Sequence, residues 1–326
     1  MRGTFFACLA AASALCLISN HARADDKGIA ADAIGCGPGK GGFDFSLRAG
    51  FSDLGPETCV HSLVSSRGAA VSATFNQQTG QYSSGIDGLA AFVYRYYGDG
   101  DFGYSMGAYV QGNDTYQFDP TRTQAINGDS VTPGAFGEVF FTDPSGLLIH
   151  DLRVRGGEIV SSTGTRSDTV VAEWFPTYHS DNFRYGNIGL PVEIGSSALW
   201  YTFSPEIMVQ YDRYETGPNG AAIFSSRDDA ARIGPQLVFL FSIDKNSLPK
   251  GAEFIGNMSL QVTTHESWDT LSHRGYTWSS LALNYTIPGT NKQPSHFGLS
   301  ATYGLGNAEG SGNKTSQIKL GLTAKY

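Results

Sequence analysis

A histidine and a serine two residues apart, His265 and Ser267, are the pair in this sequence whose types and spacing could do chemistry. Residues i and i+2 of a β-strand lie on the same face, so the imidazole could act as a base toward the serine hydroxyl. That arrangement would make Ser267 the nucleophile of an acyl transfer. The chain therefore contains one candidate hydrolase pair.

The stretch His265-Glu266-Ser267 resembles the H-x-S motif of outer-membrane phospholipases and of outer-membrane lipid A deacylases, which are serine hydrolases built on β-barrels. The resemblance implies cleavage of lipid at this site. The phospholipase pattern has an Asn that orients the histidine, whereas Trp278 and Ser279 occupy the matching part of the next strand here. Alternation also turns His265 toward the barrel interior. The sequence leaves enzyme activity open, with lipid hydrolysis as an alternative function.

Other kinds of site find no support in the residue pattern. The histidines are scattered without the spacing of metal ligands, and Asp99-Gly100-Asp101 is typical of a turn rather than of a calcium loop. The glycine-rich stretch 35–42 is not followed by an apolar helix, so no phosphate-binding loop is expected. No basic stripe indicates nucleic acid. We predict no metal, no cofactor and no nucleic-acid partner.

The end of the chain indicates which elements carry these residues. Residues 316–326 (SQIKLGLTAKY) alternate between polar and apolar without error and end on Tyr326. Ends of soluble chains are usually polar and frayed. The segment resembles the closing strand of a bacterial outer-membrane β-barrel. The resemblance implies that Tyr326 is an assembly signal read by the barrel assembly machinery.

The beginning of the chain predicts export. A basic Arg2, an apolar run from Thr4 to Ile18 and an A-x-A ending at Ala24 are typical of a secretory signal peptide over residues 1–24, cleaved near Ala24. This run of 15 residues is shorter than the roughly 20 that a spanning helix needs. Cleavage leaves Cys36 and Cys59, which we expect to form a disulfide in an oxidising compartment.

The composition agrees with a membrane barrel. Glycine makes up 41 of 326 residues, aromatic residues 12% and charged residues only 16%, which suits a sheet with an apolar outer face and a polar inner face. Without the signal peptide, 20 basic and 30 acidic residues remain, a net charge of -10. This charge would favour cations in a pore only if the acidic side chains face the lumen.

Twelve segments show the alternation of strands. Six clear ones are 199–211, 233–243, 254–264, 281–287, 297–305 and 316–326. Six softer ones are 68–76, 85–97, 102–111, 135–142, 146–161 and 168–178. Soluble all-β folds are the alternative class, but their strands are usually shorter. The pattern predicts an all-β fold, a closed antiparallel transmembrane β-barrel of about 12 strands over residues 68–326.

Two further segments, 43–51 and 183–194, are ambiguous, and counting both gives 14 strands as the alternative. Connections in outer-membrane barrels alternate between short periplasmic turns and longer outer loops. Twelve strands place the long connection 112–134 outside, whereas fourteen place it in the periplasm. We therefore predict 12 strands, with residues 25–67 forming a separate N-terminal segment that is either a plug or a periplasmic extension.

The faces opposite the apolar stripes predict the residues that line the pore. They are Glu206, Gln210, Asp212, Asn257, Gln261, His265, Lys319 and Lys325. Such a mixed polar lining suits small hydrophilic solutes, so we expect a porin-like passive channel in the outer membrane of a Gram-negative bacterium. Its partners would be these solutes, outer-membrane lipids and lipopolysaccharide, and the oligomeric state stays open. A non-conducting structural or surface-interaction barrel, filled by ion-paired side chains, is the other alternative.

Overall fold

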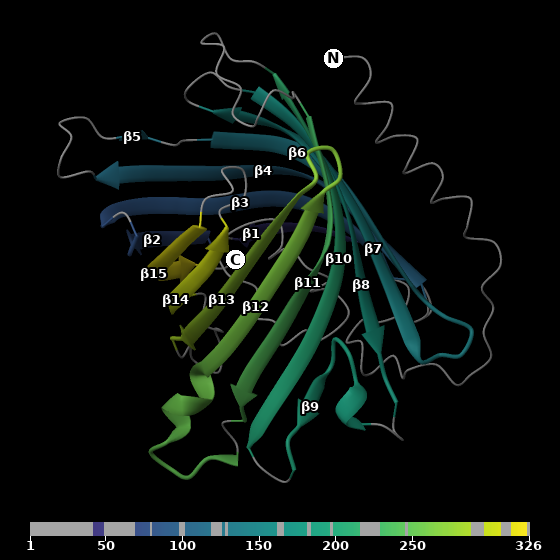
Figure 1. The fold of residues 1–326 in the computed structure, drawn as a ribbon. Coiled ribbons are helices and arrows are strands. Elements are labelled where there is room, and N and C mark those ends of the chain that lie inside the picture. The colour runs from purple at the N-terminus through teal and green to yellow at the C-terminus, as the bar shows by residue number, and fades with distance from the viewer. Residues whose placement is uncertain are drawn as a thin grey trace.

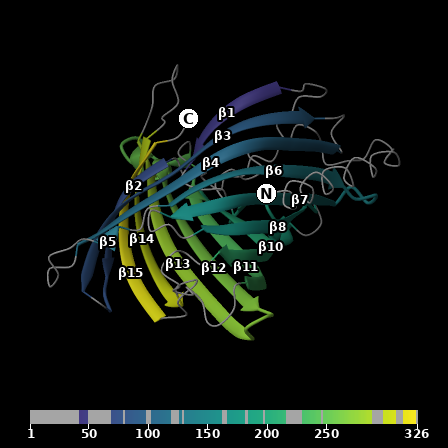
Figure 2. The same cartoon turned by 90° about the horizontal axis from the view of Figure 1, so that it is seen from above.

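The computed structural model describes residues 42–48, 69–78, 80–97, 102–118, 126–127, 130–161, 166–180, 184–195, 198–215, 229–244, 247–287, 297–307 and 314–324. Twelve antiparallel strands form a closed ring in chain order, because the last strand, β15, pairs with β2 (Figures 1 and 2). Their bounds are β2 (Ala69–Asn76), β3 (Gln81–Tyr97), β4 (Phe102–Phe118), β6 (Ser130–Thr142), β7 (Leu148–Ser161), β8 (Arg166–Tyr178), β10 (Leu199–Glu215), β11 (Asp229–Ile243), β12 (Met258–Asp269), β13 (Arg274–Thr286), β14 (Phe297–Asn307) and β15 (Lys314–Ala324). The prediction of a 12-stranded antiparallel barrel is confirmed.

Alternation along the strands separates an apolar outer face from the inner face. On β14, Phe297, Leu299 and Leu305 are each at least half exposed, and they alternate with Ser300 and Thr302 on the other side. Since neighbouring residues of a strand point to opposite faces, the same alternation recurs around the ring. Closure gives each of the twelve strands a hydrogen-bonded neighbour on both sides, which is what a barrel needs in a medium without water. None of the helices among the described residues is long and apolar enough to cross a membrane.

Segment 43–51 was expected to lie outside the sheet, and the structure corrects this. Strand β1 (Gly42–Arg48) pairs with the second half of β3, with Phe45 opposite Phe92. The first half of β3 pairs with β2. Strand β2 has eight residues and β3 has 17, so β2 leaves part of the β3 edge unpaired and β1 continues its row. The ring therefore keeps twelve strands although part of the N-terminal segment joins the wall.

The second ambiguous segment, 183–194, contains no spanning strand. It holds a short 3₁₀ helix, η2 (Arg184–Gly186), and the three-residue strand β9 (Pro191–Glu193). Strand β9 pairs with Trp200 to Thr202 at the start of β10, whereas β8 pairs with the later part of β10, from Ile207 onward. The alternative count of 14 strands is therefore wrong. One further two-residue strand, β5 (Ile126–Asn127), pairs with the end of β4.

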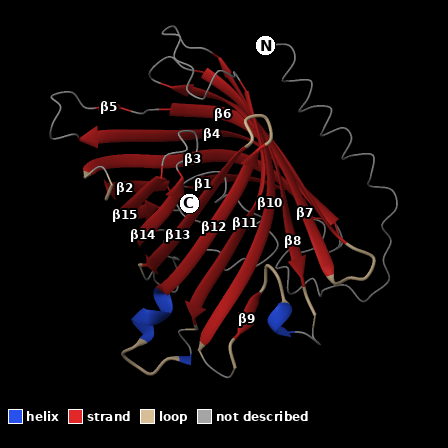
Figure 3. Cartoon of the chain, in the orientation of Figure 1, coloured by secondary structure: helices blue, strands red, loops and turns tan. Residues whose placement is uncertain are grey.

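The predicted strand 254–264 begins too early. Residues Glu253–Asn257 form a second 3₁₀ helix, η4, in which the Ile255 amide donates to the Ala252 carbonyl at 3.0 Å, and β12 starts only at Met258. Phe254 and Met258 are four residues apart, which matches two repeats of a strand, so alternation alone extended the predicted strand into η4. Figure 3 shows the two 3₁₀ helices in blue, at the end of the barrel where β9 lies.

The turn between β6 and β7 is organised by one carboxylate, Asp143. Its Oδ1 accepts the amides of Leu147 at 3.2 Å and Leu148 at 3.0 Å, and the Ser145 hydroxyl donates to Oδ2 at 2.7 Å. The hydrogen bond from Ser145, with smaller contributions from these amides, lowers the pKa of Asp143 below its ordinary value of 3.8. The charged carboxylate therefore favours the folded turn.

Replacing Asp143 by Asn is expected to lower the free energy of unfolding by about 1 kcal/mol at neutral pH, because the amide loses charge-assisted hydrogen bonds. The folded pKa is depressed, so this contribution is complete above about pH 4 and is lost as the pH falls through the folded pKa. Thermal midpoints of both proteins at pH 7 and pH 3 should converge at the lower pH. A constant difference would mean that the charge of Asp143 is unimportant.

Candidate functional site

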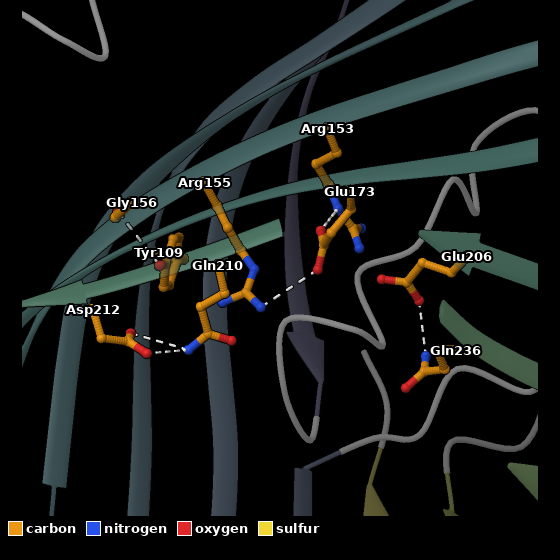
Figure 4. A network of polar contacts seen from close by, with 9 residues as sticks. All are labelled: Tyr109, Arg153, Arg155, Gly156, Glu173, Glu206, Gln210, Asp212 and Gln236. Carbon is orange, nitrogen blue, oxygen red and sulfur yellow. Dashed lines mark hydrogen bonds and ion pairs between the residues drawn. The ribbon is translucent and has the colours of Figure 1, made fainter. Parts of the chain in front are cut away.

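The inner face of the barrel has an apolar side and a charged side. The apolar side is a cluster of buried residues on β3, β4 and β6, namely Leu89, Ala91, Val93, Tyr109 and Phe136. The charged side, here called the charged wall, comprises Glu138, Asp151, Arg153, Arg155, Glu173, Glu206, Gln210, Asp212, Arg232 and Gln236 on β6, β7, β8, β10 and β11. Figure 4 shows most of these side chains. Ionisable groups are thus concentrated along one side of the interior.

Arg153 is the central residue of the charged wall and is only 1% exposed. Strand register places it between Glu138 and Glu173 on the two neighbouring strands. Its Nε donates to Glu173 Oε2 at 2.6 Å (Figure 4). Its guanidinium also lies 4.7 Å from the centre of the Phe175 ring. Arg155 reaches the other oxygen of Glu173 at 3.4 Å. Glu173 therefore binds two guanidiniums, and these contacts offset the free-energy cost of burying its charge.

A second buried ion pair joins β10 and β11. Arg232 lies 3.3 Å from Asp212, with both side chains less than a tenth exposed. Arg232 also donates to the Tyr214 hydroxyl at 3.1 Å, and the Gln210 amide donates to Asp212 at 2.8 and 3.0 Å (Figure 4 shows the Gln210 contact). All four residues have polar partners, so this group is internally satisfied.

Within the charged wall, Gln236 also donates to Glu206 at 2.8 Å. The remaining wall of the barrel is polar but less charged, and on β12 the Gln261 amide donates to the Thr263 hydroxyl at 3.2 Å. On the side where β15 closes on β2, Lys319 pairs with Asp87 at 2.6 Å. Lumenal acids are therefore largely matched by lumenal bases, so the overall negative charge of the chain does not by itself make the interior strongly negative.

The structure brings together three of the residues expected to line a pore and spreads out the others. Glu206, Gln210 and Asp212 all belong to the charged wall on β10. Gln261 and His265 share the inner face of β12, and Lys319 lies on that of β15. Asn257 ends η4 and so is not on a barrel strand, which corrects its assignment as a strand residue. Lys325, Tyr326, Cys36 and Cys59 lie outside the described residues.

Sequence reasoning missed Glu138, Asp151, Arg153, Arg155 and Glu173. A signal was present in Asp151-Leu152-Arg153-Val154-Arg155, where charged and apolar residues alternate. Such alternation places all three charges on one face of a strand. The pairing of that face with Glu173 depends on the register of β7 against β8.

The hydrolase pair is not assembled with the residue expected to orient it. His265 and Ser267 both lie on the inner face of β12, and Ser267 Oγ is buried without a hydrogen-bond partner among the described residues. Ser279 lies on the outer face, where its hydroxyl is 3.3 Å from that of Thr264, and Trp278 is the residue opposite His265. Ser279 therefore cannot orient the imidazole. Ser267 Oγ also makes no hydrogen bond to His265, so the two side chains are not joined as a nucleophile and its base.

A metal ion needs a particular arrangement of ligand side chains. Among the described residues, no three His, Cys, Asp or Glu side chains are grouped so that they could hold a metal ion.

No protein-family model matches the chain. No curated protein sequence matches it either. Solved structures do match. They are outer-membrane β-barrels.

An outer membrane channel from Pseudomonas putida F1 is 10% identical, with 93% of this chain and 100% of that chain covered and a TM-score of 0.46. The β domain of the Bordetella autotransporter BrkA is 10% identical, with coverages of 87% and 98% and a TM-score of 0.41. The translocator domain of the autotransporter NalP from Neisseria meningitidis is 10% identical, with coverages of 98% and 97% and a TM-score of 0.35. Such values are too low to transfer a function, so the roles below come from the residues of this chain.

Proposed function

We propose that this chain is a passive channel of the bacterial outer membrane for small hydrophilic solutes. The charged wall carries the proposal, because buried ionisable side chains line the inside of a closed barrel whose outside is apolar. A buried ion pair often stabilises a protein no more than well-packed apolar residues do. Stability alone therefore gives no reason for so many charges inside the barrel. Polar groups that face a lumen can instead interact with passing solutes.

The outer surface supports a membrane location. Large apolar side chains are exposed at alternating positions on neighbouring strands, including Leu281, Leu283, Tyr303, Leu320 and Leu322. Soluble monomers rarely expose contiguous apolar surface of this extent. Outer-membrane lipids and lipopolysaccharide are the partners proposed for this surface, and the barrel assembly machinery would insert it.

Reconstitution of the purified protein into planar bilayers tests the proposal. Stepwise conductance is the expected result. A barrel that inserts but shows no steps would contradict the channel and favour the non-conducting alternative, in which the ion pairs of the charged wall fill the interior.

Replacing Gln261 by Lys is expected to shift the ion selectivity toward anions. Gln261 lies on the inner face of β12, and one added charge acts on an ion about 4 Å away with about 1 kcal/mol in water, enough for roughly a fivefold change in the permeability ratio. Gln78→Lys adds the same charge in an exposed turn and serves as the control. Equal shifts in both variants would show that Gln261 does not line the conducting path.

The same measurements address lipid hydrolysis. Ser267→Ala is expected to leave conductance and any lipid turnover unchanged, because the Ser267 hydroxyl is not hydrogen-bonded to His265. A large loss of phospholipid or lipid A hydrolysis in this variant would contradict the channel as the main function.

A further inference from the structure

Asp151 differs from every other acidic residue of the charged wall. Its side chain is directed inward from β7 and is 5% exposed, and neither carboxylate oxygen has a hydrogen-bond partner among the described residues. A buried carboxylate without partners is unfavourable by several kcal/mol. Such a group in a folded protein is expected to meet a partner that the chain itself does not provide.

The neighbouring guanidiniums give part of their hydrogen bonds to Glu173, while Arg153 Nη1 and Arg155 Nε make no hydrogen bond within the described part of the chain. Arg153, the next inward residue on β7, interacts electrostatically with Asp151 but donates its Nε hydrogen bond to Glu173. Arg155 also binds Glu173. The electrostatic neighbours here are four carboxylates, Glu138, Asp151, Glu173 and Glu206, together with three guanidiniums, Arg95, Arg153 and Arg155, and the His265 imidazole. Among these carboxylates, Asp151 is the one with both oxygens buried and without a hydrogen bond to any described residue.

Aromatic residues flank Asp151 on both sides. Its direct cross-strand neighbours are Phe140 on β6 and Phe175 on β8. A Cβ placed on Gly103 of β4 would overlap the Phe140 ring, so this ring extends toward β4 and away from Asp151. The Phe175 ring already holds the Arg153 guanidinium against its face. Of the two rings, the Phe175 ring is therefore the one that brings a cation-binding aromatic face close to the Asp151 carboxylate.

We propose that Asp151 is the binding site, within the lumen, for solutes that carry a primary ammonium or guanidinium group. Two unpartnered carboxylate oxygens suit a cation with several N–H donors, since charge-assisted hydrogen bonds of this type are short and strong. A metal ion fits less well, because the described residues hold no group of ligands for one. This site would specify the class of solute that the proposed channel carries. It rests on the proposed function only for the route by which the solute reaches Asp151.

Binding is measured on the full chain purified in detergent, through the thermal unfolding midpoint at constant ionic strength. Propylammonium and methylguanidinium chlorides are the probes, with sodium and tetramethylammonium chlorides as cations that lack N–H donors. A saturable rise of the midpoint with the two probes, and little with the others, is expected for the wild type. An equal rise with sodium would overturn the proposal.

Asp151→Asn is expected to weaken probe binding by about tenfold or more, as the loss of a hydrogen bond to a charged group predicts. Without probes this variant should be at least as stable as the wild type, because it removes an uncompensated charge; a purely structural Asp151 would give a loss. Glu158→Gln is the matched control on the same strand. The Glu158 side chain is 45% exposed and forms a 3.6 Å surface ion pair with Arg166.

Phe175→Leu provides a second variant that keeps the carboxylate and removes one ring. It is expected to weaken binding of both probes by about threefold, less than Asp151→Asn does, because a single cation–π contact is weaker than a charge-assisted hydrogen bond. Unchanged binding in both variants would overturn the site. Since this readout does not require conduction, saturable binding by a silent barrel would reject the channel and retain the site. A conducting barrel without binding would do the reverse.

Discussion

Gly234→Ala is expected to destabilise the barrel more than any other single methyl addition on β11. A Cβ at Gly234 would overlap the backbone carbonyl oxygen of Glu266 on β12 and lie 2.7 Å from the Ser267 Cα. Backbone atoms cannot move aside as a flexible side chain can, so the two strands would have to separate. We expect a loss of at least about 3 kcal/mol in the free energy of unfolding, at the upper end of overpacking effects.

The ladder between β11 and β12 is interrupted at this place. Cross-strand partners are present at Ile233 with Trp268 and again at Gln236 with His265, and Pro235, which lies between them, has no amide hydrogen to donate. Glycine permits the close approach that this interruption needs.

Heat-dependent gel mobility and thermal unfolding in detergent measure the effect. Gly137→Ala on β6 is the matched control, because a Cβ there meets no atom within 4 Å. It should change stability by less than about 1 kcal/mol. Similar losses in the two variants would show that the close contact between β11 and Glu266 does not limit stability.

Glu173→Gln is expected to cost about 3–5 kcal/mol, because it leaves buried guanidiniums without their carboxylate. Arg153 and the Glu173 side chain are 1% and 2% exposed, so little water is available to replace the lost partner. The double variant Arg153→Met with Glu173→Gln should recover much of the loss, since it removes the uncompensated charge as well.

An exposed ion pair on the same two strands gives the control. Glu158 and Arg166 lie 3.6 Å apart and are about half exposed. Glu158→Gln should cost no more than about 1 kcal/mol, as is usual for surface pairs. Chemical unfolding of the four proteins measures the differences. If Glu173→Gln costs no more than Glu158→Gln, water reaches the charged wall freely and Asp151 would need no other partner.

The strands and their faces could be read from the sequence with few errors. Alternation repeats every two residues and depends only on the local chain, so Glu206, Gln210 and Asp212 could be assigned to the inner face of β10 from that strand alone. The same local rule failed at Phe254, because its spacing from Met258 matches two repeats of a strand although Phe254 lies in η4 and only Met258 belongs to β12. It also gave no warning that β1 would extend the row of β2, since that depends on the unequal lengths of β2 and β3.

What the amino-acid sequence determined by itself was the closed all-β class, the twelve strands and the side of the wall on which most residues lie. Only the tertiary structure decided which charges meet. Arg153 and Glu173 are 20 residues apart, and their 2.6 Å contact follows from the register of β7 against β8. A shift of one residue in that register would turn one strand's charges to the outside. Register comes from hydrogen bonds between strands and from closure of the whole ring, so the burial of Asp151 without a hydrogen bond to any described residue is a property of the assembled barrel.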